Sequence, residues 1–382
     1  MLVALSAATF LVTAAGSGTA PFIQSIATDL NTGLPAIAHL FSVQAIAWGT
    51  TSLFAGLLSD RFGRRPVLVF GVVLLGATRL GFASADTYAE VFTWQIVSGV
   101  GGGAFMGGAF AAVSDHVPAG MRGRALSWVI MGQSLSLVLG VPAVTLLGAL
   151  GGWRGAIATH GAFVIAAAIA VRFSLPPDPS HHAQGQVKAP LSALLQPRLV
   201  ALLAAGTTER VCFATFAIYL PTMLQRAYAI AFGPLALALG LVALGNLAGN
   251  LLGGRIADRT VSRSRVFAQT SAVTALLAMP ALMWQPGLAV SIALGFAYSF
   301  VNAAGRPSLM ATLAQVPSEL RGALFGVNVT MASLGWLLAG SVGAMLIATG
   351  GLARLGIFCT VMALLGSALA LASGAVGQVE AK

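Results

Sequence analysis

Charged residues are scarce in this chain. They make up 8% of its 382 residues, whereas hydrophobic residues make up 57%. Soluble globular domains carry roughly 25% charged residues, so the composition excludes a soluble fold and favours one with a lipid bilayer as its solvent. Cysteine is also rare: Cys212 and Cys359 both lie within apolar runs, which argues against a disulfide framework.

The sequence also lacks the motifs of common enzymes. It contains no HExxH, no GxSxG, no nucleotide-binding loop and no Cys/His spacing typical of a metal site. The stretch Gly99-Val-Gly101-Gly-Gly-Ala104 formally fits a dinucleotide fingerprint, but it lies within an apolar span, where close helix packing explains it better. His181 and His182 stand in a polar stretch and fit a solvated turn. We therefore expect no enzyme, no ATP-driven pump, no cofactor and no bound metal.

The net charge of +10 comes from Lys and Arg residues scattered singly or in small groups between apolar runs. Nucleic-acid binding would need these residues on one face or arm, so we expect no nucleic-acid partner. The pattern fits the positive-inside rule of membrane proteins.

Twelve apolar runs are long enough to span a bilayer, which takes about 20 residues. The first reaches Ala27 without a basic segment before it, which is too long for a signal-peptide core. The predicted spans are 3–28, 36–58, 66–84, 89–113, 124–149, 154–173, 199–222, 232–256, 265–284, 287–314, 322–348 and 351–374. The polar, Pro-rich stretch 174–198 predicts a linker between an N-terminal six-helix bundle (1–173) and a C-terminal one (199–382).

Basic residues are distributed unevenly about these spans. Fourteen of the 20 fall on one side, which also holds both termini, and Arg210 and Arg306 fall within spans. The other side or its edge holds Arg79, Arg154, Arg226 and Arg354. Because cytoplasmic loops carry the excess of Lys and Arg, we predict that both termini are cytoplasmic.

An internal repeat is visible at an offset near 199 residues. Gly56-x-x-x-Asp60-Arg61 recurs as Gly254-x-x-x-Asp258-Arg259, and Val117-Pro118-x-x-x-Arg122-Gly123 recurs as Val316-Pro317-x-x-x-Arg321-Gly322. The repeat predicts two related halves in parallel orientation, with a substrate path where they meet.

The segment between the second and third spans reads Gly56-Leu-Leu-Ser-Asp60-Arg61-Phe-Gly63-Arg64-Arg65. It resembles the loop signature GxxxDRxGRR of the major facilitator superfamily. The resemblance extends over the whole chain, through the twelve spans, the half-repeat and the central linker. It implies an all-α membrane fold of twelve transmembrane helices in two pseudo-symmetric six-helix bundles.

Topogenic charge alone would account for the arginines of this segment but not for Asp60, so we interpret it as a cytoplasmic gate. By resemblance, Asp60 would pair with groups such as Asp115 and Arg122 at the end of the fourth span, and Asp258-Arg259 would be a weaker copy. The predicted gate residues are Gly56, Asp60, Arg61, Gly63, Arg64, Arg65, Asp115, Arg122, Asp258 and Arg259.

The fifth span combines small residues with a proline, and these are Gly132, Ser136, Gly140, Pro142 and Gly148. Ordinary tight packing would suit them, but the segment also resembles a variant of the superfamily's antiporter motif, which implies efflux in exchange for protons. The fourth span departs from the drug:proton antiporters, which carry an Arg where this chain has Gln95, and this puts the usual coupling route in doubt.

Three charged residues lie inside predicted spans: Glu209, Arg210 and Arg306. A charge near the bilayer centre costs about 2.5–3.5 kcal/mol. Glu209 and Arg306 would lie at similar depths and could meet, whereas Arg210 would point about 100° away from Glu209. We interpret Glu209 as the proton-coupling carboxylate and Arg306 as its partner or an anion-binding group; a static buried ion pair is the alternative. Asp29, at the outer end of the first span, is a further coupling candidate.

Polar residues recur at helical spacing on spans that should line the path. Tyr298, Asn302 and Arg306 share one helix face, although single intramembrane Asn residues also hold helices together. The predicted substrate-binding residues are Gln24, Gln44, Gln133, Tyr219, Asn246, Asn250, Tyr298, Asn302 and Arg306.

These features predict an alternating-access transporter of the inner membrane that exports a small organic solute, a drug or a metabolite, by proton-coupled antiport. The surplus of one positive charge among the intramembrane residues favours an anionic or zwitterionic solute. The alternative is an importer or facilitator of a small metabolite or sugar with the same fold. The expected partners are the solute, protons and the lipid bilayer, and we expect a monomer.

Overall fold

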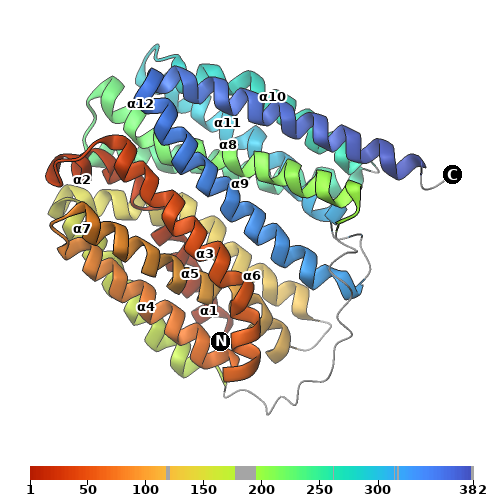
Figure 1. The fold of residues 1–382 in the computed structure, drawn as a ribbon, viewed down its shortest axis with the longest axis horizontal. Coiled ribbons are helices and arrows are strands. Elements are labelled where there is room, and N and C mark those ends of the chain that lie inside the picture. The colour runs from red at the N-terminus through yellow and green to blue at the C-terminus, as the bar shows by residue number, and fades with distance from the viewer. Residues whose placement is uncertain (118–120, 177–194, 261, 314, 316–317, 380–382) are drawn as a thin grey trace. The chain divides into compact units, whose positions relative to one another are not determined.

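The computed structural model describes residues 1–117, 121–176, 195–260, 262–313, 315 and 318–379. Within these ranges the regular elements are helices (Figure 1). A bilayer interior offers no water to the backbone, so a spanning segment must satisfy its own N–H and C=O groups, and a helix does so locally.

Contacts between residues divide the chain into two compact units. The first comprises Met1–Gln186 with Ala231–Gly240, and the second comprises Val187–Ile230 with Leu241–Lys382. The domain boundaries predicted at 173 and 199 stay a prediction, because residues 177–194, with His181 and His182, lie outside the described ranges.

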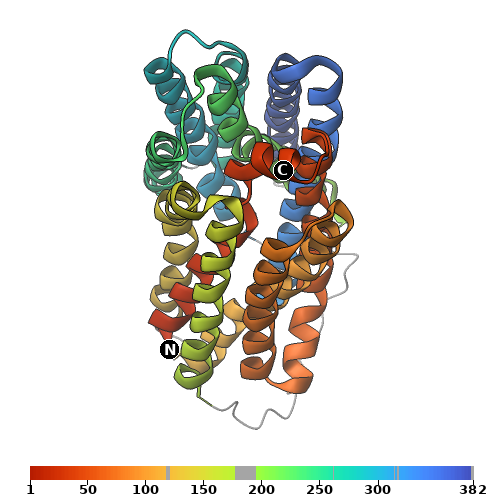
Figure 2. The same ribbon diagram turned by 90° about the vertical axis from the view of Figure 1, so that its left-hand side faces the viewer.

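The first unit is built from the helices α1 to α7. Helix α5 packs against α3 and α4, while α7 packs against α4 and α1, and α6 lies along α1. Figure 2 shows these helices in red to yellow-green, seen at a right angle to Figure 1. Their bounds are α1 (Leu2–Ser17), η1 (Ala20–Phe22), α2 (Ile23–Asp29), α3 (Leu34–Phe62), α4 (Arg64–Ser84), α5 (Tyr88–His116), α6 (Arg122–Leu135), η3 (Ser136–Gly140) and α7 (Val141–Ser174).

In the second unit, α12 packs against α8 and α10, and α11 packs against α10 and α8. Helix α9 contributes its first residues to the first unit and the rest to the second. The bounds are α8 (Pro197–Tyr228), α9 (Phe232–Arg259), α10 (Arg263–Met283), α11 (Leu288–Leu313) and α12 (Ser318–Val379).

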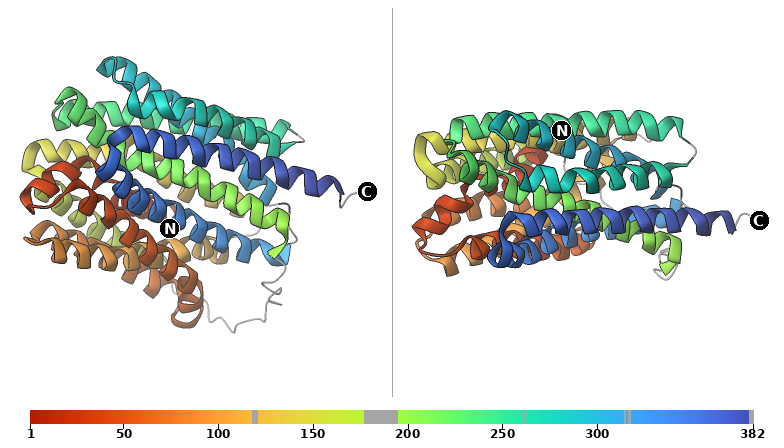
Figure 3. Two further views of the ribbon diagram at one scale, coloured as in Figure 1. Left: turned by 45° about the horizontal axis from the view of Figure 1, so that its top comes forward. Right: turned by 90° about the horizontal axis from the view of Figure 1, so that it is seen from above.

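Two of the long helices each contain a sharp turn and so hold two spans. Gly152 in α7 has φ 62°, and Gly351 in α12 has φ 66°, a left-handed backbone that favours glycine. The turn at Gly152 falls in the predicted gap between the fifth and sixth spans, and Gly351 is the first residue of the predicted twelfth span. Figure 3 shows α12 as two arms, in lighter and darker blue, that fold back on each other.

The first and fifth spans are less regular than the sequence predicted. The expected single helix 3–28 is broken between Ser17 and Ile23, where a 3-10 turn carries Pro21. Proline has no N–H to donate and its ring displaces the preceding turn, which ends α1. In the fifth span, where a proline kink was expected, a π-helical turn, Ser136–Gly140, directly precedes Pro142.

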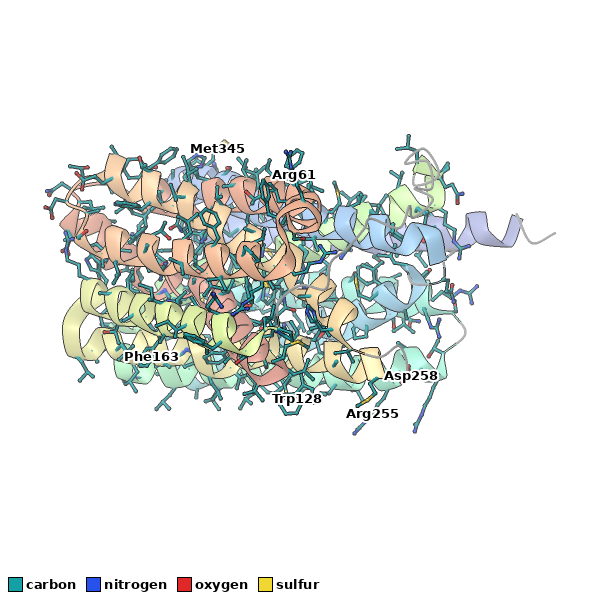
Figure 4. The ribbon with its side chains drawn as sticks, turned by 90° about the horizontal axis from the view of Figure 1, so that it is seen from below. Arg61, Trp128, Phe163, Arg255, Asp258 and Met345 are labelled. Carbon is teal, nitrogen blue, oxygen red and sulfur yellow. The ribbon has the colours of Figure 1, made fainter. Side chains whose placement is uncertain are left out.

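Large apolar side chains lie exposed on the outer faces of both units. Trp128 (41% exposed), Phe163 (57%) and Met345 (59%) are examples, and Figure 4 labels them at the surface of the helices that carry them. Eight stretches of the described residues are long and apolar enough to cross a membrane, and two of these are the double spans Trp128–Ser174 and Val327–Ser373. A surface of this kind is solvated by lipid.

Glycines bring helix backbones into direct contact. In the second unit, a Cβ at Gly245 would lie 2.5 Å from the carbonyl oxygen of Phe296, and Gly249 and Gly253 meet Phe300 and Ala304 of α11 in the same way. In the first unit, a Cβ at Gly99 would lie 2.5 Å from the Gln44 carbonyl oxygen. The glycine runs of the fourth and eighth spans therefore serve helix packing, as the sequence predicted.

We predict that Gly249→Ala destabilises the protein, because the added methyl group would overlap the Phe300 backbone, which cannot move as a side chain can. Overpacking of this kind costs about 1–3 kcal/mol. The measurement is the thermal unfolding midpoint of the detergent-solubilised protein. Gly254→Ala on the same helix is the control, because no atom lies within 4 Å of its Cβ position. Equal midpoints for the two variants would contradict the packing argument.

Candidate functional site in the second unit

A small polar pocket lies where α8, α11 and α12 meet. It holds about 10 Å³ of free space, room for roughly one water molecule. Its lining residues are Gly206, Glu209, Arg210, Arg306, Leu309, Met310, Asn328 and Ala332. The three charged residues that the sequence placed inside spans therefore come together in one pocket.

Glu209 and Arg210 form a direct ion pair in this pocket. The Arg210 Nε donates to Glu209 Oε2 at 2.6 Å, and its Nη2 donates to Oε1. The residues are only 4% and 8% exposed. The expectation that Arg210 points away from Glu209 is wrong: the long arginine side chain reaches the carboxylate of the preceding residue. In a low-dielectric site the two charges stabilise each other most when they touch.

Aromatic rings support the arginine of this pair. The Arg210 guanidinium lies 4.6 Å from the centre of the Phe213 ring, and Phe213 packs edge-on against Trp336 at 6.1 Å. Helix α12 also packs closely against Arg210: a Cβ added at Gly335 would lie 2.5 Å from the Arg210 Cβ. These contacts hold the guanidinium in place by cation–π attraction and close packing.

Arg306, the other arginine of the pocket, is not the direct partner of Glu209. It is half-buried, and among the described residues no hydrogen bond or ion pair is made to its guanidinium. Because Arg210 already occupies the carboxylate, the pocket carries a formal charge of +1 that resides on Arg306. A planar guanidinium without an ion-pair partner suits a carboxylate or phosphate oxygen pair.

Other residues predicted to bind substrate are engaged in bonds within the second unit. The Tyr298 hydroxyl donates to the Cys212 carbonyl at 3.1 Å, and the Tyr219 hydroxyl donates to the Ala339 carbonyl at 3.4 Å. Asn250 Nδ2 donates to Asn246 Oδ1 at 3.0 Å. Asn302 is buried, and its Oδ1 has no hydrogen-bond partner among the described residues.

In the first unit, two of the singled-out residues form an amide network between α3 and α5. Gln95 Nε2 donates to Gln44 Oε1, and Gln44 Nε2 donates to Ser98 Oγ, both at 3.1 Å. Each of these side chains is buried. Gln95, which replaces the arginine of the drug:proton antiporters, thus joins two helices through neutral groups. Gln24 and Gln133 are half-buried.

Asp29 is exposed at the end of α2. Its Oδ2 accepts a hydrogen bond of 2.6 Å from Trp153 Nε1, at the start of the second arm of α7. The neighbouring Arg154 donates to the carbonyls of Ala83 and Ala85 and pairs with Asp86 at 3.3 Å. These bonds fasten α2 and α4 to α7 at one end of the unit.

The predicted gate is described only in part. The side chains of Asp60, Asp115 and Arg122, like Gly56, lie outside the described part of the chain. Gly63 joins α3 to α4 with φ 91°, which accounts for a glycine in the motif. Arg64 donates to Ser59, and Arg65 is half-buried. Arg61, Asp258 and Arg259 are exposed; Figure 4 labels the first two.

Sequence reasoning missed three residues that the structure brings forward. Met310 and Asn328 line the pocket, 3.8 Å apart from Sδ to Nδ2. Met310 follows Arg306 by four residues, so the helical period could have found it. Arg79, which the sequence analysis assigned only to the outer side or its edge, is buried in the first unit with 1% exposure.

Comparison with known proteins agrees with this architecture. A sequence profile described as the Major Facilitator Superfamily matches residues 5–340. The chain belongs to the major facilitator superfamily. It is therefore a multi-pass membrane transporter with twelve transmembrane helices in two pseudo-symmetric six-helix bundles, and the predicted fold class is confirmed.

Curated relatives of this superfamily member include transporters and a resistance protein. The inner membrane transport protein YdhP of Escherichia coli (strain K12) is 28% identical over 342 residues, covering 88% of this chain and 87% of the relative. A chloramphenicol resistance protein of Streptomyces lividans is 26% identical over 246 residues, covering 63% and 62%. A bacterial homologue of the human lysosomal transporter Spinster shares the fold, with a TM-score of 0.76 at 14% identity, covering 98% and 94% of the two chains.

We predict that the Glu209–Arg210 pair stabilises the folded protein and that the loss of either member destabilises it. Arg210→Gln leaves a buried carboxylate without its direct partner and should cost about 3 kcal/mol. Glu209→Gln keeps one amide oxygen to accept from Arg210 but leaves the Arg210 and Arg306 charges without a carboxylate in the pocket, and should also cost about 3 kcal/mol. The double substitution removes both charges and should unfold at a higher temperature than Arg210→Gln alone.

The measurement is the unfolding midpoint of all three variants in detergent. Asp86→Asn is the control, because its ion pair with Arg154 is exposed to solvent and should contribute little. If Arg210→Gln unfolds at the wild-type midpoint, the pair does not stabilise the fold.

Proposed function

We propose that this transporter exports a small organic solute that carries a negative group, in exchange for protons, across the inner membrane, with both termini in the cytoplasm. The observation that carries the proposal is the charge arrangement of the pocket: Glu209 is paired to Arg210, and Arg306 has no partner among the described residues.

Arg306 supports binding of the solute's anionic group. A guanidinium offers two parallel N–H donors to a carboxylate or phosphate, and a lipophilic cation would meet a pocket of like charge. Leu309, Met310 and Ala332 form an apolar wall beside it; the pocket of this structure has room for about one water molecule, so the organic part would enter as the pocket opens during alternating access. This mixture of one charged anchor and an apolar wall is typical of small-molecule sites.

Glu209 supports proton coupling, and the charge of the solute sets the direction of that coupling. A zwitterion with its anionic group on Arg306 would place its cationic group near Glu209, which must then be ionised. Protons and such a solute compete for the Glu209 carboxylate. Because the carboxylate binds one or the other, the transporter carries a proton in one direction and the solute in the opposite direction. A solute without a cationic group would instead bind better once Glu209 is protonated, because Arg210 is then released. Proton and solute would then cross the membrane in the same direction, and the transporter would be an importer driven by proton entry.

Two further features support export. The fifth span combines a π-helical turn with Pro142, in the place where the antiporter motif of the superfamily lies. In addition, one relative is a chloramphenicol resistance protein by name. The second candidate, a proton-coupled importer of organic anions, is favoured by the same Arg306 and differs in the predicted response to a pH gradient.

The test is transport by purified protein in liposomes with an imposed pH gradient and a panel of zwitterionic, anionic and cationic solutes. An exchanger should accumulate a zwitterion in vesicles with an acidic lumen, because protons leave as the solute enters. Accumulation of a simple anion in vesicles with an alkaline lumen would establish the importer instead. Accumulation of cationic dyes alone would overturn both.

We predict that Arg306→Gln lowers the affinity for the transported solute by at least about tenfold, since a charge-assisted bidentate bond is lost. Arg306→Lys should retain part of the affinity. Glu209→Gln should still bind the solute but lose accumulation driven by the pH gradient. The control is Arg226→Gln, which should transport normally. Arg226 is an exposed arginine on α8, the helix that carries Glu209. If Glu209→Gln keeps pH-driven accumulation, Glu209 is structural and Asp29 becomes the coupling candidate.

A further inference from the structure

Arg79 of α4 is among the most completely buried side chains of the first unit. It is 1% exposed, and its Nη1 donates to Thr19 Oγ1 at 3.0 Å. Thr19 lies in the break between α1 and α2. The helix that the sequence predicted as continuous is therefore interrupted where a buried cation meets it.

The remaining donors of this guanidinium are not satisfied. Its Nε and Nη2 are fully buried and have no hydrogen-bond partner among the described residues. The Ser17 Oγ at the end of α1 is in the same state. The Thr19 hydroxyl accepts from Arg79 and so keeps its own hydrogen to donate. Arg79 and Ser17 thus hold three buried polar atoms without a bond, and two of them are obligatory donors.

No carboxylate of the described residues pairs with Arg79. The ionisable neighbour that interacts with it is His160 of α7, whose Nε2 lies 3.1 Å from the Leu11 carbonyl oxygen. A carbonyl only accepts, so the hydrogen-bond geometry assigns the proton of His160 to Nε2, and the ring brings no negative charge. The nearby Phe82 ring, 5.9 Å from the guanidinium, offers only a weak cation–π contact.

Such a cation calls for a compensating negative charge. Burying an unpaired guanidinium away from water is strongly unfavourable, and the partial charge at the end of α1 compensates only a fraction of it. The Nε and Nη2 hydrogens form one edge of the guanidinium fork, the edge that receives anions. In membrane transporters, broken helices also leave polar groups beside bound ions.

We propose that the first unit holds a binding site for a small monovalent inorganic anion of the size of chloride, formed by Arg79 with Ser17 and Thr19 at the break of α1. The anion accepts from Arg79 Nε and Nη2 and from the Ser17 hydroxyl, while Thr19, bonded to the remaining nitrogen Nη1, holds the guanidinium in position. This site is separate from the pocket of Glu209, Arg210 and Arg306, and does not depend on the solute that the transporter carries.

The test is thermal unfolding of the purified, detergent-solubilised protein in sodium chloride, sodium bromide and sodium gluconate at equal ionic strength. We expect saturable stabilisation by chloride and bromide over gluconate, of roughly 3 °C when the halide stands about tenfold above its dissociation constant. Arg79→Gln should lose the difference between the salts. Arg154→Gln, an arginine of the same unit with an exposed ion pair, should keep it.

Two more variants keep the test decisive. Ser17→Ala removes one donor and should raise the halide concentration for half-maximal stabilisation about three- to tenfold; this variant decides the matter if Arg79→Gln does not fold. Arg306→Gln should leave the halide effect unchanged. Equal unfolding midpoints in all three salts would overturn the proposal and assign the Arg79 donors to buried water. A halide effect that survives Arg79→Gln, or that disappears in Arg306→Gln, would overturn it as well.

Discussion

Because hydrocarbon cannot form hydrogen bonds, each polar group that this chain carries into the membrane must find its partner within the chain. The backbone meets this constraint by forming helices in both units. It departs from the regular helix where proline or a left-handed glycine compels it, at Pro21, Pro142, Gly152 and Gly351. Gly152 and Gly351 make the turns between spans. Pro142 follows the π-helical turn of the fifth span, and Pro21 lies where α1 ends beside Arg79.

The same constraint acts more severely on charged side chains. Glu209 and Arg210 meet it by pairing directly, with the guanidinium held further by Phe213. Arg306 and Arg79 have no such partner among the described residues, one half-buried in a pocket and the other fully buried. An unpaired buried charge is costly to fold and is therefore a strong indication of a ligand. The two arginines thus suggest two ligands of the same sign, a solute group in the second unit and an inorganic anion in the first.

Close backbone contact gives these charges fixed positions. Gly245, Gly249 and Gly253 allow α9 to touch the α11 backbone, and α11 carries Arg306. In the first unit, a Cβ at Gly161 would lie 2.9 Å from the Arg79 Cβ, so that α7 fixes the stem of this side chain. Rigid helices that hold a few charged side chains suit a transporter, because a change in which charges pair with each other must be coupled to solute binding.

The local pattern of residues was sufficient to predict the twelve spans, the class of fold and the family, because hydrophobic run length and a contiguous motif depend only on neighbours along the chain. Glu209, Arg210 and Arg306 could be found in the same way, since a charge in an apolar run is conspicuous. Their pairing could not: side-chain torsions and the approach of α11 and α12 decided that Arg210 rather than Arg306 bonds Glu209. The burial of Arg79 also depended on distant packing, since a residue near a helix end is at the surface or inside according to which helices cover it. Such contacts between segments far apart in sequence leave no period or spacing in the chain from which they could be read.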